Sequence, residues 1–250
     1  MSGHSKWATI KHKKAKVDAQ KGVTFAKFSR DITVAAKAGG TAPEANFRLR
    51  TAIDNAKAAG LPNDNIKRAI DKATSAGGGD NFEEISYEGY GPGGIAIFIQ
   101  AMTDNRNRTA GDIRSYFNKN NGNLGETGCV GWMFKEEGCI SIDKDNIDYD
   151  QLFEISINAG AEDFSEEDDE YKIITSSDHL QEIAEQVQQA GYKLKTVEIT
   201  RNPENTVPIT DIDTVKMLLR LLDSLENHDD VQNVYANFEI DDDLLEKAAT

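Results

Sequence analysis

The sequence is poor in the residues that build metal centres, disulfides and many active sites. Its 250 residues include two cysteines, Cys129 and Cys139, and four histidines. It contains no Cys/His set at metal-ligand spacing, no nucleophile elbow, no HExxH and no P-loop or kinase motif. We therefore predict a protein that is not an enzyme and has no cofactor or metal site. The two cysteines are expected to be reduced thiols, as is usual in the cytoplasm.

Long hydrophobic runs are also missing. No stretch reaches the roughly eighteen apolar residues that a membrane span needs. The first residues are basic but lack the apolar core of a signal peptide. These absences predict a cytoplasmic protein without a membrane partner.

Acidic residues are almost absent from the first thirty positions, although they dominate the rest of the chain. Residues 3–30 hold one acid, Asp18, against eight lysines and arginines, with Trp7, Phe25 and Phe28 among them. Residues 1–78 carry a net charge of +9, whereas residues 79–250 carry −24. Clustered cations with interspersed aromatic residues are typical of a protein that binds the phosphate backbone. The predicted nucleic-acid-binding residues are Lys6, Trp7, Lys11, His12, Lys13, Lys14, Lys16, Lys21, Lys27 and Arg30.

The residue types in this stretch indicate whether it contacts the phosphate backbone or recognises the base sequence. Lysine outnumbers arginine seven to one between residues 3 and 30. Lysine is a flexible point charge, and base reading favours the planar fork of arginine, so phosphate contact is predicted more than sequence readout. Trp7 has two interpretations: it packs back on the following helices, or it stacks on an unpaired base. We predict stacking. The alternative for the charged run as a whole is a merely solvated helix face.

Six further cations are candidate secondary contacts. Two of them lie in the segment TDNRNRTAGD, which is expected to join a strand to the start of a helix, where anions bind readily. Pairing of these two arginines with neighbouring acids is the alternative. The segment NGNLGETG, residues 121–128, is expected to be a connector with many turns. The secondary candidates are Arg48, Arg50, Lys67, Arg68, Arg106 and Arg108.

Periodicity predicts an α+β multidomain protein that begins with three helices. The first helix is expected to begin at Val17 and to be stopped by Gly39–Gly40, the second to run from near Pro43 to Gly60, and the third to start near Pro62. Gly77–Gly79 is expected to be a flexible linker. The predicted domains are a basic helical nucleic-acid-binding domain (1–78), an α+β domain (79–134 with 206–250) and an inserted acidic ferredoxin-like domain (135–205).

The two α+β domains are predicted from their strand and helix patterns. Strands are expected at Gly94–Ala101 and Cys129–Phe134, and a helix at Thr109–Asn120 that starts with a capping box of Thr109 and Asp112. Residues 139–200 follow the order β-α-β-β-α-β, which is ferredoxin-like. An amphipathic helix at 215–225 and a half-buried strand at 234–240 complete the pattern. Patterning alone leaves a sequential arrangement of the two domains open beside an insertion.

Three blocks of the sequence resemble the YebC/PmpR family in the expected order. They are GHSKWATIKHKKAKVDAQKG from Gly3, LPNDNIKRAIDKA from Leu61, and the long block from Tyr87 to Phe134. The resemblance implies three domains, the third inserted in the second, in a cytoplasmic DNA-binding transcriptional regulator. The family also includes a mitochondrial translational activator and proteins that act on the ribosome.

These observations lead to three hypotheses. The first is a non-enzymatic regulator of transcription that contacts the DNA backbone through its lysine-rich helical domain. The second is an RNA- or ribosome-binding translation factor. The third is an acidic protein-interaction module in which a basic arm, residues 1–16, docks on the protein's own acidic domains. The predicted partners are DNA, or ribosomal or messenger RNA, and the ribosome in the second case; a monomer or weak dimer is expected.

Overall fold

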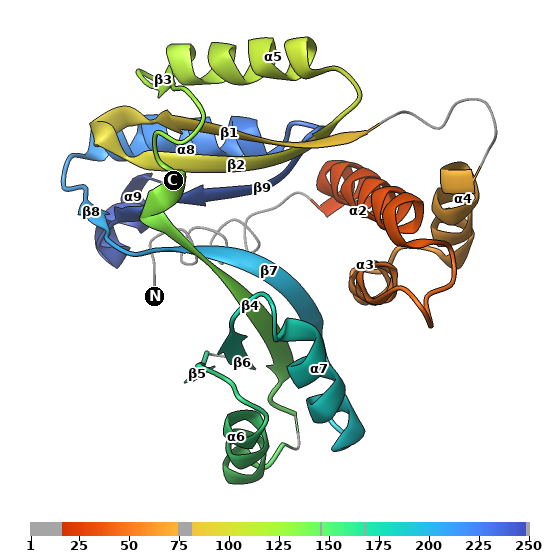
Figure 1. The fold of residues 1–250 in the computed structure, drawn as a ribbon. Coiled ribbons are helices and arrows are strands. Elements are labelled where there is room, and N and C mark those ends of the chain that lie inside the picture. The colour runs from red at the N-terminus through yellow and green to blue at the C-terminus, as the bar shows by residue number, and fades with distance from the viewer. Residues whose placement is uncertain (1–16, 75–81, 146, 168, 249–250) are drawn as a thin grey trace. The chain divides into compact units, whose positions relative to one another are not determined.

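The computed structural model describes residues 17–74, 82–145, 147–167 and 169–248, and only the backbone of 17–21 and of Asp242 (Figure 1). The described residues form two compact units. The first contains 17–30, 82–135 and 203–248, and the second contains 31–74 and 136–202. Each unit is described by itself.

Three helices begin the described part of the chain, as the sequence predicts. They are α2 (Val17–Gly39), α3 (Phe47–Ala58) and α4 (Asn63–Thr74). The prediction that the second helix starts near Pro43 is wrong, because Pro43 lies in a turn and the Asn46 side chain caps the helix by accepting a hydrogen bond from the Leu49 amide at 3.0 Å. An amide oxygen at this position satisfies a backbone donor that the helix itself leaves free.

Two buried polar side chains connect these helices within the second unit. The Asn46 Nδ2 group donates to the carbonyl oxygens of Ala35 at 2.9 Å and Gly40 at 2.8 Å, near the end of α2. The Thr33 hydroxyl of α2 donates to the Ala69 carbonyl of α4 at 3.0 Å. The three helices therefore pack with satisfied polar groups between them, in addition to a small apolar core.

The first unit is built on a four-stranded sheet in the order β3-β1-β2-β9. The sheet carries helices, two short 3₁₀ turns and a small parallel pair of strands, β8 and β10. The elements are β1 (Glu83–Tyr90), η1 (Pro92–Gly94), β2 (Ala96–Thr103), α5 (Arg106–Lys119), β3 (Asn123–Leu124), η2 (Gly131–Met133), β8 (Val207–Pro208), α8 (Ile212–Glu226), β9 (Val231–Ala236), β10 (Phe238–Glu239) and α9 (Asp242–Ala248).

Alternation along β2 divides the apolar residues of this unit between two faces of the sheet. Ile97 and Ile99 belong to the main core, which includes the buried leucines of α8 and the buried face of α5. Ala96 and Phe98 belong to a smaller cluster with Val130 and Phe134. The predicted helix at 215–225 is thus confirmed, and its six fully or nearly buried residues explain its strong amphipathic pattern.

The strand predicted at Cys129–Phe134 is wrong, because a buried carboxylate holds this segment in another conformation. Oε1 of Glu88 accepts from the Gly128 amide at 2.8 Å, and Oε2 accepts from the amides of Val130 at 2.8 Å and Gly131 at 2.7 Å. These amides are therefore directed at one side chain instead of a neighbouring strand. The segment forms the turn η2, which leaves Trp132 69% exposed.

The capping box predicted at Thr109 is also wrong. Helix α5 begins at Arg106, and the side chain of Asn105 caps it by accepting from the Arg108 amide at 3.1 Å. Thr109 lies one turn inside the helix and is fully buried. Its hydroxyl group is used for a different contact, described below.

The second unit contains the predicted β-α-β-β-α-β order. Its sheet has the strand order β5-β6-β4-β7, and α6 and α7 pack on one apolar core with it. The elements are β4 (Phe134–Asp143), α6 (Tyr149–Asn158), β5 (Asp163–Glu166), β6 (Glu170–Thr175), α7 (Leu180–Gln189) and β7 (Thr196–Pro203).

The chain segment 136–202 interrupts the first unit, whose parts 82–135 and 203–248 come together around one core. This confirms the predicted α+β multidomain fold with one α+β part inserted in the other. The boundaries predicted for the three domains stay a prediction. Within the described residues, no helix is long and apolar enough to cross a membrane.

Candidate nucleic-acid interface

The described cations of α2 that the sequence singles out are Lys27 and Arg30. Lys27 Nζ donates to the carbonyl oxygen of Glu226 at 2.7 Å. Arg30 donates to the Asp229 carbonyl, lies 3.2 Å from Oδ1 of Asp230, and has its guanidinium 5.0 Å from the centre of the Phe82 ring. Both cations therefore have partners at the end of α8, where carbonyl groups left free by the helix attract positive charge.

Asp230 is the centre of a buried polar cluster in the first unit. Its side chain is 3% exposed. Its Oδ2 atom accepts from the hydroxyl groups of Thr109 at 2.7 Å and Thr103 at 3.2 Å, and from Arg108 at 2.9 Å. Burial alone would raise the pKa of this carboxyl group, but the hydrogen bonds from Thr109 and Arg108 and the charge of Arg30 outweigh burial and hold the pKa below its usual range. Asp230 is thus a charged, fully bonded anchor.

An open hollow of about 520 Å³ lies beside this anchor. Its wall carries Arg30, Arg108 and His228 together with Asp104 and Asp112. Nε2 of His228 is 3.3 Å from Oδ2 of Asp112. Because charges of both signs are paired across the wall, this hollow does not have the uniform positive potential that a phosphate backbone needs.

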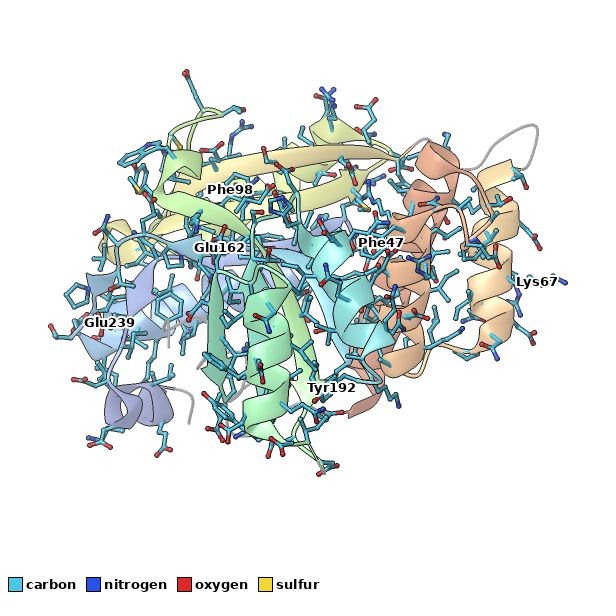
Figure 2. All side chains as sticks on the ribbon, turned by 60° about the horizontal axis from the view of Figure 1, so that its bottom comes forward. Phe47, Lys67, Phe98, Glu162, Tyr192 and Glu239 are labelled. Carbon is cyan, nitrogen blue, oxygen red and sulfur yellow. The ribbon has the colours of Figure 1, made fainter. Side chains whose placement is uncertain are left out.

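Helix α4 presents a different situation. Lys67 and Arg68 are exposed, and among the described residues neither has a salt bridge or side-chain hydrogen bond. Figure 2 shows the Lys67 side chain extending away from the helix, while Ile66 and Ala69 are buried. Both cations lie between the buried positions Ile66 and Ala69 and are exposed, so they are available to an incoming anion.

The two candidate arginines of α3 are less available. Nη2 of Arg50 lies 2.7 Å from Oε1 of Glu185, and its guanidinium is 5.4 Å from the centre of the Phe47 ring. Arg48 is 3.8 Å from Asp31, at the limit of a salt bridge, and both side chains are largely exposed. An exposed pair at this distance contributes little and is easily exchanged for another anion.

Arg106 and Arg108 are both paired with acids, which is the alternative that the sequence left open. Nε of Arg106 lies 2.6 Å from Oε2 of Glu83. Nη2 of Arg108 lies 2.7 Å from Oδ1 of Asp104 and 2.9 Å from Oδ2 of Asp230. Contact of these arginines with nucleic acid would therefore require that existing ion pairs be exchanged.

Most of the predicted primary contacts lie outside the described residues, as does the glycine linker at 77–79. For Lys21, which lies in α2, only the backbone is described. Among the described residues there is no group of three His, Cys, Asp or Glu side chains that could hold a metal ion. The primary contacts outside the described residues are Lys6, Trp7, Lys11, His12, Lys13, Lys14 and Lys16.

Sequence reasoning missed the two buried carboxylates that organise the first unit. Glu88 lies in strand β1, which was not predicted, and Asp230 precedes β9. In a chain with 43 acidic residues, no local signal separates these two from the many solvated ones. An indirect signal for Asp230 is Thr109, a hydroxyl residue at a position where the periodicity of α5 demands a buried side chain.

Two family models match this chain over most of its length. One, described as the TACO1/YebC protein N-terminal domain, matches residues 5–76. The other, described as the TACO1/YebC second and third domain, matches residues 82–238. The models therefore separate the three-helix region from the α+β parts.

Curated relatives and a solved structure match over nearly the whole chain. A probable transcriptional regulatory protein from Natranaerobius thermophilus is 53% identical over 249 residues, which cover 98% of this chain and 99% of the relative. One from Pelotomaculum thermopropionicum is 54% identical, covering 97% of this chain and all of the relative. The crystal structure of a conserved hypothetical protein from Aquifex aeolicus matches with a TM-score of 0.84 and 46% identity, covering 94% of this chain and 97% of that one.

Proposed function

Because this chain belongs to the TACO1/YebC family, whose curated relatives here are named probable transcriptional regulatory proteins, we propose that it regulates transcription by binding DNA. Binding occurs through the phosphate backbone, and the contacts come from the lysines between residues 6 and 21 and from the outer face of α4. The reaction is association only, without catalysis.

The observation that carries this proposal is the difference between the two groups of cations. Lys67 and Arg68 on the basic three-helix region are exposed and have no partner among the described residues. Arg106 and Arg108 on the acidic α+β part are engaged with carboxylates at 2.6–2.9 Å. A cation without a partner displaces the counterions condensed on a DNA phosphate, whereas a paired cation must first lose its carboxylate.

The distribution of net charge also supports DNA contacts from the three-helix region. Residues 1–78 carry +9 and residues 79–250 carry −24. The acidic part repels DNA, so the contacts come from the basic helical region. Because the contacts are mainly from lysine to phosphate, the binding discriminates weakly between sequences.

Alanine variants on α4 test the proposal. Lys67→Ala with Arg68→Ala should weaken binding to duplex DNA and make the plot of log K against log salt shallower by about one to two units. The matched control is Arg114→Ala, which removes an exposed cation from α5 on the acidic part and should change neither quantity. Equal effects of the α4 pair and the control would refute the proposal that α4 contacts DNA.

RNA is the second candidate ligand, and Trp7 is the observation that favours it. An aromatic residue in a lysine-rich segment is suited to stacking on unpaired bases, which duplex DNA does not offer. If RNA is the ligand, Trp7→Ala should weaken binding to a hairpin RNA and spare plain duplex DNA. If Trp7 packs on the helices, the same change should lower the melting temperature and weaken binding to both ligands equally.

A further inference from the structure

Helix α6 exposes an apolar stripe that the proposed DNA contacts do not use. Tyr149, Phe153 and Ile157 follow one another at intervals of four residues and are 41%, 41% and 42% exposed. Residues four apart lie on the same side of a helix. The neighbouring positions Leu152 and Ser156 are fully buried and hold the helix on the core, so the stripe is additional to the residues that fold this unit.

Aromatic packing fixes the stripe and extends it beyond the helix. The rings of Tyr149 and Phe153 stack with their centres 6.1 Å apart. Both rings pack in an edge-to-face arrangement with the Phe164 ring on strand β5, and their ring centres lie 5.5 Å and 5.6 Å from its centre. Tyr171 on β6 lies 5.7 Å from Phe164 and connects this group to the buried core. We call these four residues together with Ile157 the aromatic patch.

Such a patch is costly to leave in water. Ordinary surfaces expose single apolar residues, whereas connected groups of large apolar side chains mark interaction sites. The rings hold one another in place, so little side-chain freedom is lost when a partner covers them. The patch lies on α6 and on β5, which is an edge strand of its sheet.

Charge around the aromatic patch indicates the occupant. Residues 144–170, which contain the patch up to Phe164 and end beside Tyr171, hold eleven acids and one cation, Lys144. That lysine is itself paired with Glu166 at 2.8 Å. Asp150 and Glu154 are exposed on α6 next to the apolar stripe. A second copy of this face would bring like charges together, whereas a basic partner would neutralise them.

We propose that the aromatic patch is a docking surface for a cationic amphipathic segment of a protein partner. The partner places apolar side chains on Tyr149, Phe153 and Ile157, and its lysines or arginines meet the surrounding carboxylates. An amphipathic helix has the required i, i+4 spacing of apolar anchors. This role is separate from DNA binding, because none of the cations proposed to bind DNA belongs to α6, β5 or β6.

The test uses the full chain and a synthetic peptide of about five helical turns, with leucines on one face and lysines on the other. An isomer of the same composition, in which leucine and lysine do not segregate, measures attraction by charge alone. The helical isomer should bind at least about tenfold more tightly than the scrambled one, as expected when several apolar anchors are buried together.

Variants then locate the site. Phe153→Ser with Ile157→Ser should remove the preference for the helical isomer and leave duplex DNA binding unchanged. Ile199→Ser is the matched control, because Ile199 is 45% exposed on strand β7 of the same unit and outside the aromatic patch. It should keep the full preference. Should the double variant fail to fold, Ile157→Ser alone keeps the test valid, since no ring contact depends on that residue.

Three outcomes would overturn the proposal. In the first, the two peptide isomers would bind equally well, which would mean charge attraction without an apolar site. In the second, the Ile199 variant would lose as much affinity for the helical isomer as the patch variants do. In the third, sedimentation would find a dimer that the patch variants convert to monomers, which would make a second copy of this chain the occupant.

Discussion

Asp230 is predicted to be the residue whose charge matters most to the stability of the first unit. The change Asp230→Asn keeps the shape of the side chain and replaces a carboxylate with a neutral amide. Two guanidinium groups and two hydroxyl groups contact this carboxylate at 2.7–3.2 Å. Asn retains hydrogen-bond capacity toward the hydroxyl groups but loses the attraction of both arginines.

The magnitude follows from the two charged contacts. A hydrogen bond from a charged donor stabilises by about 1.5–3 kcal/mol net. The Arg108 side chain is 48% exposed and regains water, so its contribution is discounted toward zero. The loss on Asp230→Asn is therefore about 1.5–3 kcal/mol, which lowers the melting temperature of a unit of this size by about 5–10 °C.

At acid pH, the difference in melting temperature between the wild type and the Asp230→Asn variant should disappear. The pKa of Asp230 is lowered in the folded state. Its charge therefore contributes stability that is fully present above the unfolded pKa of about 3.9 and is lost as the pH falls through the lower folded pKa. The melting curves of the two proteins should converge at the acid end of a pH series.

Calorimetry at several pH values provides the measurement, and Asp229→Asn is the control. Asp229 is the exposed neighbour, and its change removes the same charge without touching the buried cluster. A melting shift at neutral pH no larger than that of the control, or a difference that persists in acid, would refute the reasoning.

Two further predictions concern the first unit's other carboxylate and the thiols. Glu88→Gln directs an NH₂ group at backbone amides, so it should destabilise the protein by about 2 kcal/mol. It should also shift the fluorescence emission of Trp132, which is measured in a Trp7→Phe background so that only one tryptophan emits. Unchanged emission would contradict the role of Glu88 in holding η2. Burial raises the pKa of Cys139 to about 12, and burial followed by the charge of Glu88 raises that of Cys129. Iodoacetamide at mildly alkaline pH should therefore modify Cys139 only after unfolding and Cys129 slowly, as read by mass spectrometry; rapid labelling of Cys139 in the folded protein would contradict this.

Periodicity was sufficient for the elements whose buried face is continuous. The leucines of α8 and the alternation in β9 predict both elements, because one apolar face must meet the core. The β-α-β-β-α-β order of the inserted part follows from the same rule.

The misses occurred where a distant side chain overrides the local pattern. The sequence CVGWMF reads as a strand, but Glu88, forty residues away, binds its amides and turns it into η2. Thr109 reads as a cap, but Asp230 binds its hydroxyl group inside α5. Contacts of this range leave no local periodicity, so sequence alone did not identify either carboxylate.

The candidate site was predictable in its charge but not in the availability of each cation. The sequence offers Lys67, Arg68, Arg106 and Arg108 as secondary contacts, and it leaves the pairing of the last two with acids open. The structure separates them, because the first two have no partner among the described residues and the last two are paired with carboxylates.

The proposed function depends on electrostatic contact between this protein and the phosphate backbone of nucleic acid. The direct measurement is the affinity of the full chain for duplex DNA and for a single strand across a range of salt concentrations. The proposed contacts are Lys6, Lys11, Lys13, Lys14, Lys16, Lys21, Lys67 and Arg68, and these eight cations neutralise about five phosphates, since not all can face one backbone. The slope of log K against log salt should be about −4.5 on duplex DNA and about −3.5 on a single strand. A slope near zero on both ligands would contradict the account.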